Sequence, residues 1–192
     1  MNLDSILQDD FMVKENEIDA IIRSYWIVII GNYTINIENT VDVLGSVRFP
    51  DFASFLTELP LQFNLVSGDF DCSALVNLTS LKGVPIQVGG TFNCAYTNIR
   101  SLNYAPRSAQ KLIFDNTIKS LSTNCNCDFN QVQIIWRNSN PLDSFPSTIL
   151  EYAAFLPTIL KYQTYFEVWN ADYSFNEPGF ENLIADIEEG LQ

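Results

Sequence analysis

Residues 66–85 read V-S-G-D-F-D-C-S-A-L-V-N-L-T-S-L-K-G-V-P, and residues 88–106 repeat this stretch with changes as V-G-G-T-F-N-C-A-Y-T-N-I-R-S-L-N-Y-A-P. Val, Gly, Phe and Cys recur in the same order and spacing, and each copy closes with a leucine and a proline. Self-similarity at a period of about twenty residues is typical of a solenoid, in which each repeat packs only on its neighbours. Solenoids mostly bind other macromolecules, so the repeat favours a binding function.

The first half of each copy alternates between apolar and polar residues, as a β-strand does. Phe70 and Cys72 therefore point to the same side as Phe92 and Cys94 of the next copy, and we predict that equivalent residues stack. The second half returns through pairs of apolar residues. These return pairs are Leu56 with Leu59, Leu78 with Leu81, Ile99 with Leu102, Ile118 with Leu121, and Leu142 with Phe145. Further inward strand positions are predicted at Val47 and Phe49, Leu112 and Phe114, and Ile134 and Trp136.

These patterns predict a mainly β (α+β) fold, a short leucine-rich-repeat-like solenoid with a parallel sheet over residues 46–146. Residues 147–192 are predicted to form an aromatic, acidic C-terminal cap. Its terminal helix has one apolar face, formed by Phe180, Leu183, Ile184 and Ile187.

Residues 1–45 are predicted to form an N-terminal cap of helix and strand. Helical spacing is found for Leu3, Ile6 and Leu7, and again for Ile18, Ile21 and Ile22. The apolar run Tyr25–Ile30 indicates a buried strand. Gly31-Asn32 is expected to break it before a second strand over residues 33–37.

The net charge of −13 is concentrated at the two ends of the chain. Residues 1–19 hold six acids and one base, and residues 162–192 hold seven acids and no base. Direct nucleic-acid binding is not expected, because phosphate neutralisation needs clustered Lys and Arg. A partner protein with a basic surface is compatible with this charge, and so is a simple role in solubility. No apolar run approaches the ~20 residues of a membrane span, and the acidic start differs from a secretion signal, so we expect a cytoplasmic protein.

The sequence contains no histidine, which removes the commonest general base and metal ligand. Cys72 and Cys94 occupy inward repeat positions and are expected to be buried thiols. Cys125 and Cys127 could join them in binding zinc, but this spacing is not that of a known zinc finger. No metal, cofactor or catalytic residue is therefore predicted.

Several phrases resemble leucine-rich-repeat-like proteins common in large tailed bacteriophages. They are N-Y-T-I-N (32–36), V-D-V-x-G-x-V (41–47), L-T-E-L-P-L-x-F (56–63), V-S-G-D-F-D-C-S (66–73), N-L-T-S-L-K-G-V-P (77–85) and V-G-G-T-F-N-C (88–94). The resemblance covers about residues 32–106, with weaker echoes to residue 146. It implies a phage-encoded protein made in the host cytoplasm, without catalytic activity.

Our first hypothesis is a non-catalytic phage accessory protein that binds a basic host protein, such as a defence protein, and inhibits or redirects it. The predicted binding residues are the outward strand positions Arg48, Asp69, Asp71, Thr91, Asn93, Ile113, Asp115 and Ile135, together with Trp169 and Tyr173 of the C-terminal cap. A hydrophobic stripe at Ile113 and Ile135 would suit a partner or a second copy in a homo-oligomer. Three alternatives stay open: an acidic DNA mimic, a virion structural protein, and a hydrolase that uses Asp69 and Asp71 as a carboxylate pair.

Overall fold

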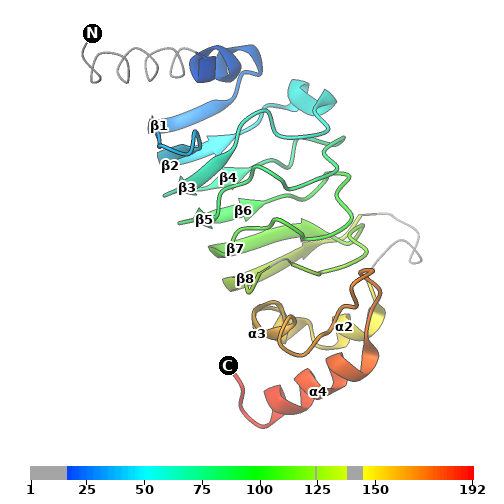
Figure 1. Cartoon of the computed structure of the whole chain (residues 1–192). Helices are drawn as coiled ribbons and strands as arrows, with labels where there is room; N and C mark the ends of the chain where they lie inside the picture. The colour runs from blue at the N-terminus through cyan, green and yellow to red at the C-terminus, as the bar shows by residue number, and fades with distance from the viewer. Residues whose placement is uncertain (1–16, 124, 138–144) are drawn as a thin grey trace.

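The computed structural model describes residues 17–123, 125–137 and 145–192. It confirms a mainly β fold, a β-solenoid of about five turns whose strands form one sheet, with helices at both ends (Figure 1). The predictions for Leu3, Ile6, Leu7 and Leu142 lie outside the described residues.

The sheet starts with an antiparallel hairpin and continues as a parallel stack. β1 (Val28–Ile35) pairs antiparallel with β2 (Val41–Arg48), and all the later pairings named here are parallel. β2 is long enough to pair with both β3 (Phe63–Val66) and β4 (Phe70–Asp71). In the next turn, β5 (Gln87–Val88) lies beside β3, and β6 (Thr91–Asn93) lies beside β4. β7 (Ser108–Asp115) spans both β5 and β6, and β8 (Asp128–Ile135) follows it.

The two central turns bend in the middle of their strands, at Ser67-Gly68 and Gly89-Gly90. Backbones approach closely at this bend, since a Cβ added to Gly89 would lie 2.1 Å from the Ser67 carbonyl oxygen. The bends still bond to each other, with Gly89 N–H donating to the Val66 carbonyl and Gly90 N–H to the Gly68 carbonyl. Glycine is therefore required here by space, because any side chain would separate two turns.

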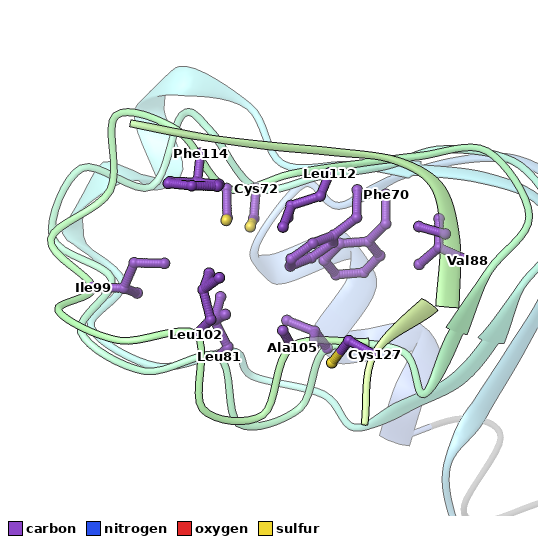
Figure 2. Close-up of a cluster of buried hydrophobic side chains, with 14 of the residues drawn as sticks. Phe70, Cys72, Leu81, Val88, Ile99, Leu102, Ala105, Leu112, Phe114 and Cys127 are labelled. Carbon is purple, nitrogen blue, oxygen red and sulfur yellow. The ribbon is translucent and has the colours of Figure 1, made fainter. Parts of the chain in front are cut away.

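The predicted stacking is confirmed. Phe70 is the register partner of Phe92, and Phe92 is the partner of Leu112. Cys72 and Cys94 follow them on the inward side and are fully buried. In Figure 2, Phe70 and Leu112 of the sheet face Leu81 and Leu102 of the return legs across the core. The predicted inward residues Val47, Phe49, Leu112 and Phe114 are buried, as are the return residues Leu56, Leu59, Leu78, Leu81, Ile99, Leu102, Ile118, Leu121 and Phe145.

The last turn differs from the prediction by two residues. β8 aligns Val132 with Leu112 and Ile134 with Phe114, and both Val132 and Ile134 pack against the core. Trp136, predicted to point inward, lies beyond the end of β8 and is 63% exposed. The prediction for Trp136 is therefore wrong. The inward positions of this turn are occupied by Val132 and Ile134, two residues earlier than the predicted pair Ile134 and Trp136.

At the N-terminal end, residues 17–24 are helical and cover the first turn, with Ile18 buried and Ile21 and Ile22 packed against the core. The expectation of a buried strand at Tyr25–Ile30 is wrong. β1 begins at Val28, runs through Gly31 without a break, and exposes Val28 and Ile30. Gly31 does not interrupt the strand because it pairs with another glycine, Gly45, in β2.

At the C-terminal end, short helices close the solenoid (Figure 1). They are α2 (Ser147–Glu151), the 3-10 turn η3 (Ala153–Phe155), α3 (Leu156–Tyr162) and α4 (Glu177–Glu188), and a further 3-10 turn, η1 (Asp51–Phe55), follows β2. α3 packs against β8, so it covers the last strand of the stack. The predicted face of α4 is confirmed, since Phe180, Leu183, Ile184 and Ile187 are all buried.

Candidate binding surface

The outer face of the sheet brings four of the predicted binding residues into one row. Arg48 pairs with Asp71, Asp71 with Asn93, and Asn93 with Ile113. Each follows a buried residue in its strand, so its side chain points away from the core. Because parallel strands lie about 4.8 Å apart, this row is continuous along the solenoid.

A second outward row runs beside the first, and one side-chain hydrogen bond links it to the preceding turn. Thr91 pairs with Lys111, which pairs with Gln131. The Asp69 carboxylate accepts a bond of 2.6 Å from the backbone N–H of Thr91, so it links two turns. Both rows are mainly polar over β4 to β8.

The predicted hydrophobic stripe at Ile113 and Ile135 is only partly exposed, since both side chains are half-buried. Their register partners also differ from each other: Ile113 pairs with Asn93 and Gln133, whereas Ile135 pairs with Asp115. They therefore belong to different rows and do not form one stripe.

Asp115 was predicted on the outer face and is instead buried, with 3% of its surface exposed. One carboxylate oxygen accepts bonds from the backbone N–H and hydroxyl of Thr117, and the other accepts from the Tyr96 N–H and from Arg137, 3.3 Å away. β7 continues two residues past the point where β6 ends against it, so Asp115 lies at the corner of the turn. The prediction for Asp115 is wrong because the repeat suggests strands of equal length in every turn, whereas β7 extends further than β6.

The apolar part of the outer face lies at the N-terminal end, where no binding residue except Arg48 was predicted. Ile30 and Leu44 occupy diagonal positions on β1 and β2 and are 64% and 71% exposed. Val28 and Leu65 extend the same face on β1 and β3. We call Val28, Ile30, Leu44 and Leu65 the apolar stripe.

Sequence reasoning missed the apolar stripe, although part of the signal was present. Val41, Val43 and Val47 alternate as inward residues of β2, which places Leu44 outward. Val28 to Ile30 form an unbroken apolar run instead of an alternating one, so the sequence does not show which of them face outward.

Two exposed aromatic side chains lie near the start of β1 and the end of β2, two residues before Val28 and four residues after Arg48. Trp26 and Phe52 form an edge-to-face pair with ring centroids 5.9 Å apart, although each is more than half exposed. Large apolar side chains that stay in water while contacting each other are typical of protein-binding hot spots. Asp42 on β2 and Asp69 and Asp71 beyond β3 add negative charge beside the stripe.

The two aromatic residues predicted in the C-terminal cap have different surroundings. Trp169 is half-buried, packs against Phe175 with ring centroids 5.5 Å apart and a tilt of 59°, and donates its indole N–H to the side-chain oxygen of Gln163. Gln163 is itself buried and donates to the Leu121 carbonyl, so Trp169 helps to hold the cap on the solenoid. Tyr173 is 54% exposed and stays available for contact.

Acidic side chains surround a groove in the C-terminal cap, between α2 and α4. The groove encloses about 270 Å³ and has Tyr152, Phe180 and Ile184 among its apolar lining residues. Its other lining residues include four glutamates and no base: Glu151, Glu177, Glu181 and Glu188.

Three of the four cysteines are buried, and Cys125 is partly exposed. The Cys72 and Cys94 thiols donate to the carbonyls of Asn93 and Ile113 in the next turn. Burial raises the pKa of both thiols well above the ordinary value, and burial with the neighbouring Cys125 raises the pKa of Cys127 to about 12. Within the described part of the chain, no group of three or more Cys, Asp or Glu is placed to hold a metal ion.

The two carboxylates considered for hydrolysis both make bonds that shape the backbone. Asp71 accepts from the backbone N–H and the hydroxyl of Ser73, and Asp69 accepts from Thr91 N–H. These hydrogen bonds give both aspartates a structural role in the turns, and this role explains why Asp occupies both positions.

Comparison with protein-family models, with curated proteins and with solved structures finds nothing that matches this chain. Over the residues that the structure describes, no helix has the length and apolar character to cross a membrane.

Proposed function

We propose that this protein is a binding module that holds a partner protein on the outer face of its sheet, centred on the apolar stripe. The observation that carries the proposal is the exposure of Ile30 and Leu44 beside the exposed Trp26–Phe52 pair, on an otherwise polar sheet face. Burying an exposed leucine or isoleucine contributes about 1.5–3 kcal/mol, so this stripe supplies the free energy that a polar face lacks.

The surrounding charge indicates the chemistry of the partner. Asp42, Asp69 and Asp71 lie on the same sheet face, and the whole chain carries −13. A complementary partner has an apolar centre with Lys or Arg around it. With the resemblance to phage leucine-rich-repeat-like proteins, this supports an accessory protein that binds a basic host protein in the host cytoplasm and inhibits or redirects it.

A matched pair of variants tests the proposal. Leu44→Asp places a charge in the apolar stripe. Val76→Asp is the control: it places the same charge on a residue that is 49% exposed and lies outside the stripe, in the loop that follows β4. Purified wild type and both variants are immobilised and exposed to lysate of the bacterial host, and retained proteins are quantified by mass spectrometry. We expect one stoichiometric protein to be lost with Leu44→Asp and kept with Val76→Asp.

Two results would contradict the proposal. One is an unchanged set of retained proteins in Leu44→Asp while circular dichroism shows that both variants fold. The other is self-association through the stripe: light scattering after gel filtration would then show a wild-type dimer that Leu44→Asp converts to monomer, with no host protein retained.

A further inference from the structure

A second groove runs along a different side of the solenoid, at the corners where each return leg enters the next strand. It encloses about 380 Å³ and is lined by residues from five successive passes of the chain. Thr40, Gln62, Gly83, Tyr104 and Cys125 represent these passes in order. We call this the corner groove.

The charge of the corner groove is opposite to that of the molecule. Lys82 and Arg107 line it, and none of the described lining residues is acidic, in a chain with 23 acids and 10 bases. Both side chains are exposed, and neither forms an ion pair with another described residue. The other lining groups are mainly apolar, with Pro85 and Ile86 between the two cations in sequence.

The length of the corner groove defines the shape of a ligand. Five passes have four spacings of about 4.8 Å, or roughly 19 Å in total. An extended chain rises about 3.3 Å per residue, so about six residues fit along it. Mainly apolar walls with two cations on neighbouring passes suit an extended peptide that carries both acidic and apolar side chains.

We propose that the corner groove binds an extended acidic peptide segment of a partner, with its carboxylates near Lys82 and Arg107. Gly83 also lines the groove; it has φ of +99°, and an added Cβ would lie 2.8 Å from the Leu61 carbonyl oxygen, so glycine is required here by the close approach of two passes. The site is separate from the outer sheet face and does not depend on the function proposed above.

Fluorescence anisotropy tests the proposal with a labelled hexapeptide of alternating glutamate and leucine and a matched peptide of lysine and leucine. We expect the full-length protein to bind the acidic peptide saturably and the combined Lys82→Glu, Arg107→Glu variant to bind it at least tenfold more weakly. Arg100→Glu, an exposed base on a return leg outside the groove, is the matched control and should bind as wild type does. Leu44→Asp should also bind normally, which separates this site from the apolar stripe.

Cys125 gives an independent readout, because it lines the groove and is the only cysteine that is not buried. Its rate of thiol exchange is measured with a dianionic aromatic disulfide and with a neutral dipyridyl disulfide. We expect each charge reversal, Lys82→Glu or Arg107→Glu, to lower the anionic-to-neutral rate ratio about threefold at low salt, with a smaller effect at high salt. Bound acidic peptide should slow both reagents.

Three results would overturn the proposal. The first is absence of saturable binding of the acidic peptide by folded wild type. The second is binding, or a rate ratio at Cys125, that does not change when both cations are reversed. The third is equal binding of the lysine peptide.

Discussion

Phe70 of β4 lies directly over its register partner Phe92 of β6, with ring centroids 6.0 Å apart. Phe49 and Phe63 contact Phe70 from other directions, at 5.9 Å and 5.2 Å. This aromatic spine joins the first turns to the central ones and therefore contributes to the packing between neighbouring turns on which a solenoid depends.

Phe92→Ala should lower the free energy of unfolding by about 3–5 kcal/mol, because Phe92 is fully buried and the neighbouring turns cannot close the cavity. Urea unfolding followed by circular dichroism measures the change. Phe52→Ala removes the same ring from a site 59% exposed and should cost less than about 1 kcal/mol. Equal losses in the two variants would show that Phe92 is not part of the spine.

Gly89→Ala should destabilise by more than about 2 kcal/mol, because its Cβ would lie 2.1 Å from backbone of the preceding turn. Gly190→Ala is the control, because at Gly190 an added Cβ meets no other atom and only backbone strain acts. Gly190 has φ of +113° but nothing within 4 Å, so only the conformational cost of about 1–2 kcal/mol applies. Thermal unfolding of the two variants should therefore show the larger loss at Gly89, and the reverse order would contradict the close approach of the turns.

Asp115→Ala should destabilise by about 3 kcal/mol, since it leaves the Tyr96 N–H and the Arg137 guanidinium without their carboxylate acceptor. Asp69→Ala removes one inter-turn bond at an exposed site and should cost about 1 kcal/mol. Denaturant titration of both variants measures the difference. If Asp115 were an exposed binding residue, its replacement would leave stability unchanged and weaken partner binding instead.

At pH 8, iodoacetamide should label Cys125 in the native protein and leave Cys72, Cys94 and Cys127 unlabelled for much longer. Burial raises the pKa of these three thiols, so almost none of the reactive thiolate is present. Peptide mapping by mass spectrometry identifies the labelled sites, and unfolding in guanidinium should make all four react. Fast native labelling of Cys94 would contradict its position in the core.

The stability of the protein should fall as the pH rises above about 9. Cys127 has a pKa of about 12 in the folded chain and an ordinary value of 9.0 when exposed, so between these values the unfolded state loses a proton that the folded state keeps. One such group lowers the free energy of unfolding by at most about 1.4 kcal/mol per pH unit. Cys127→Ala should have a flatter dependence between pH 9 and 10.5 than wild type, and identical slopes would exclude this thiol as the cause.

The repeat allowed the centre of the fold to be predicted from the sequence. Phe70 and Phe92, and Cys72 and Cys94, occur at the same positions in two copies, and stacking in register is the arrangement that buries both pairs. The helix face of α4 was predictable for a similar reason, because four apolar residues recur at helical spacing.

The sequence predictions were wrong where the local pattern of apolar and polar residues does not show what covers a residue in the fold. Val28 and Ile30 are apolar, but β1 is the first strand, and nothing described covers its outer face. Asp115 follows Phe114 as Asp71 follows Phe70, yet the longer β7 moves it to a buried corner. The predicted strand residues therefore lie mainly over β4 to β8, whereas the most exposed apolar side chains of the same sheet face lie on β1 to β3.

The bends at Ser67-Gly68 and Gly89-Gly90 give the two central turns the same outline, so each turn presents the same packing surface to the next one. A lineage that duplicated one such turn would lengthen the molecule by a single strand spacing of about 4.8 Å and leave both ends unchanged. Reach along the solenoid can thus evolve in discrete increments, separately from the chemistry of either terminus.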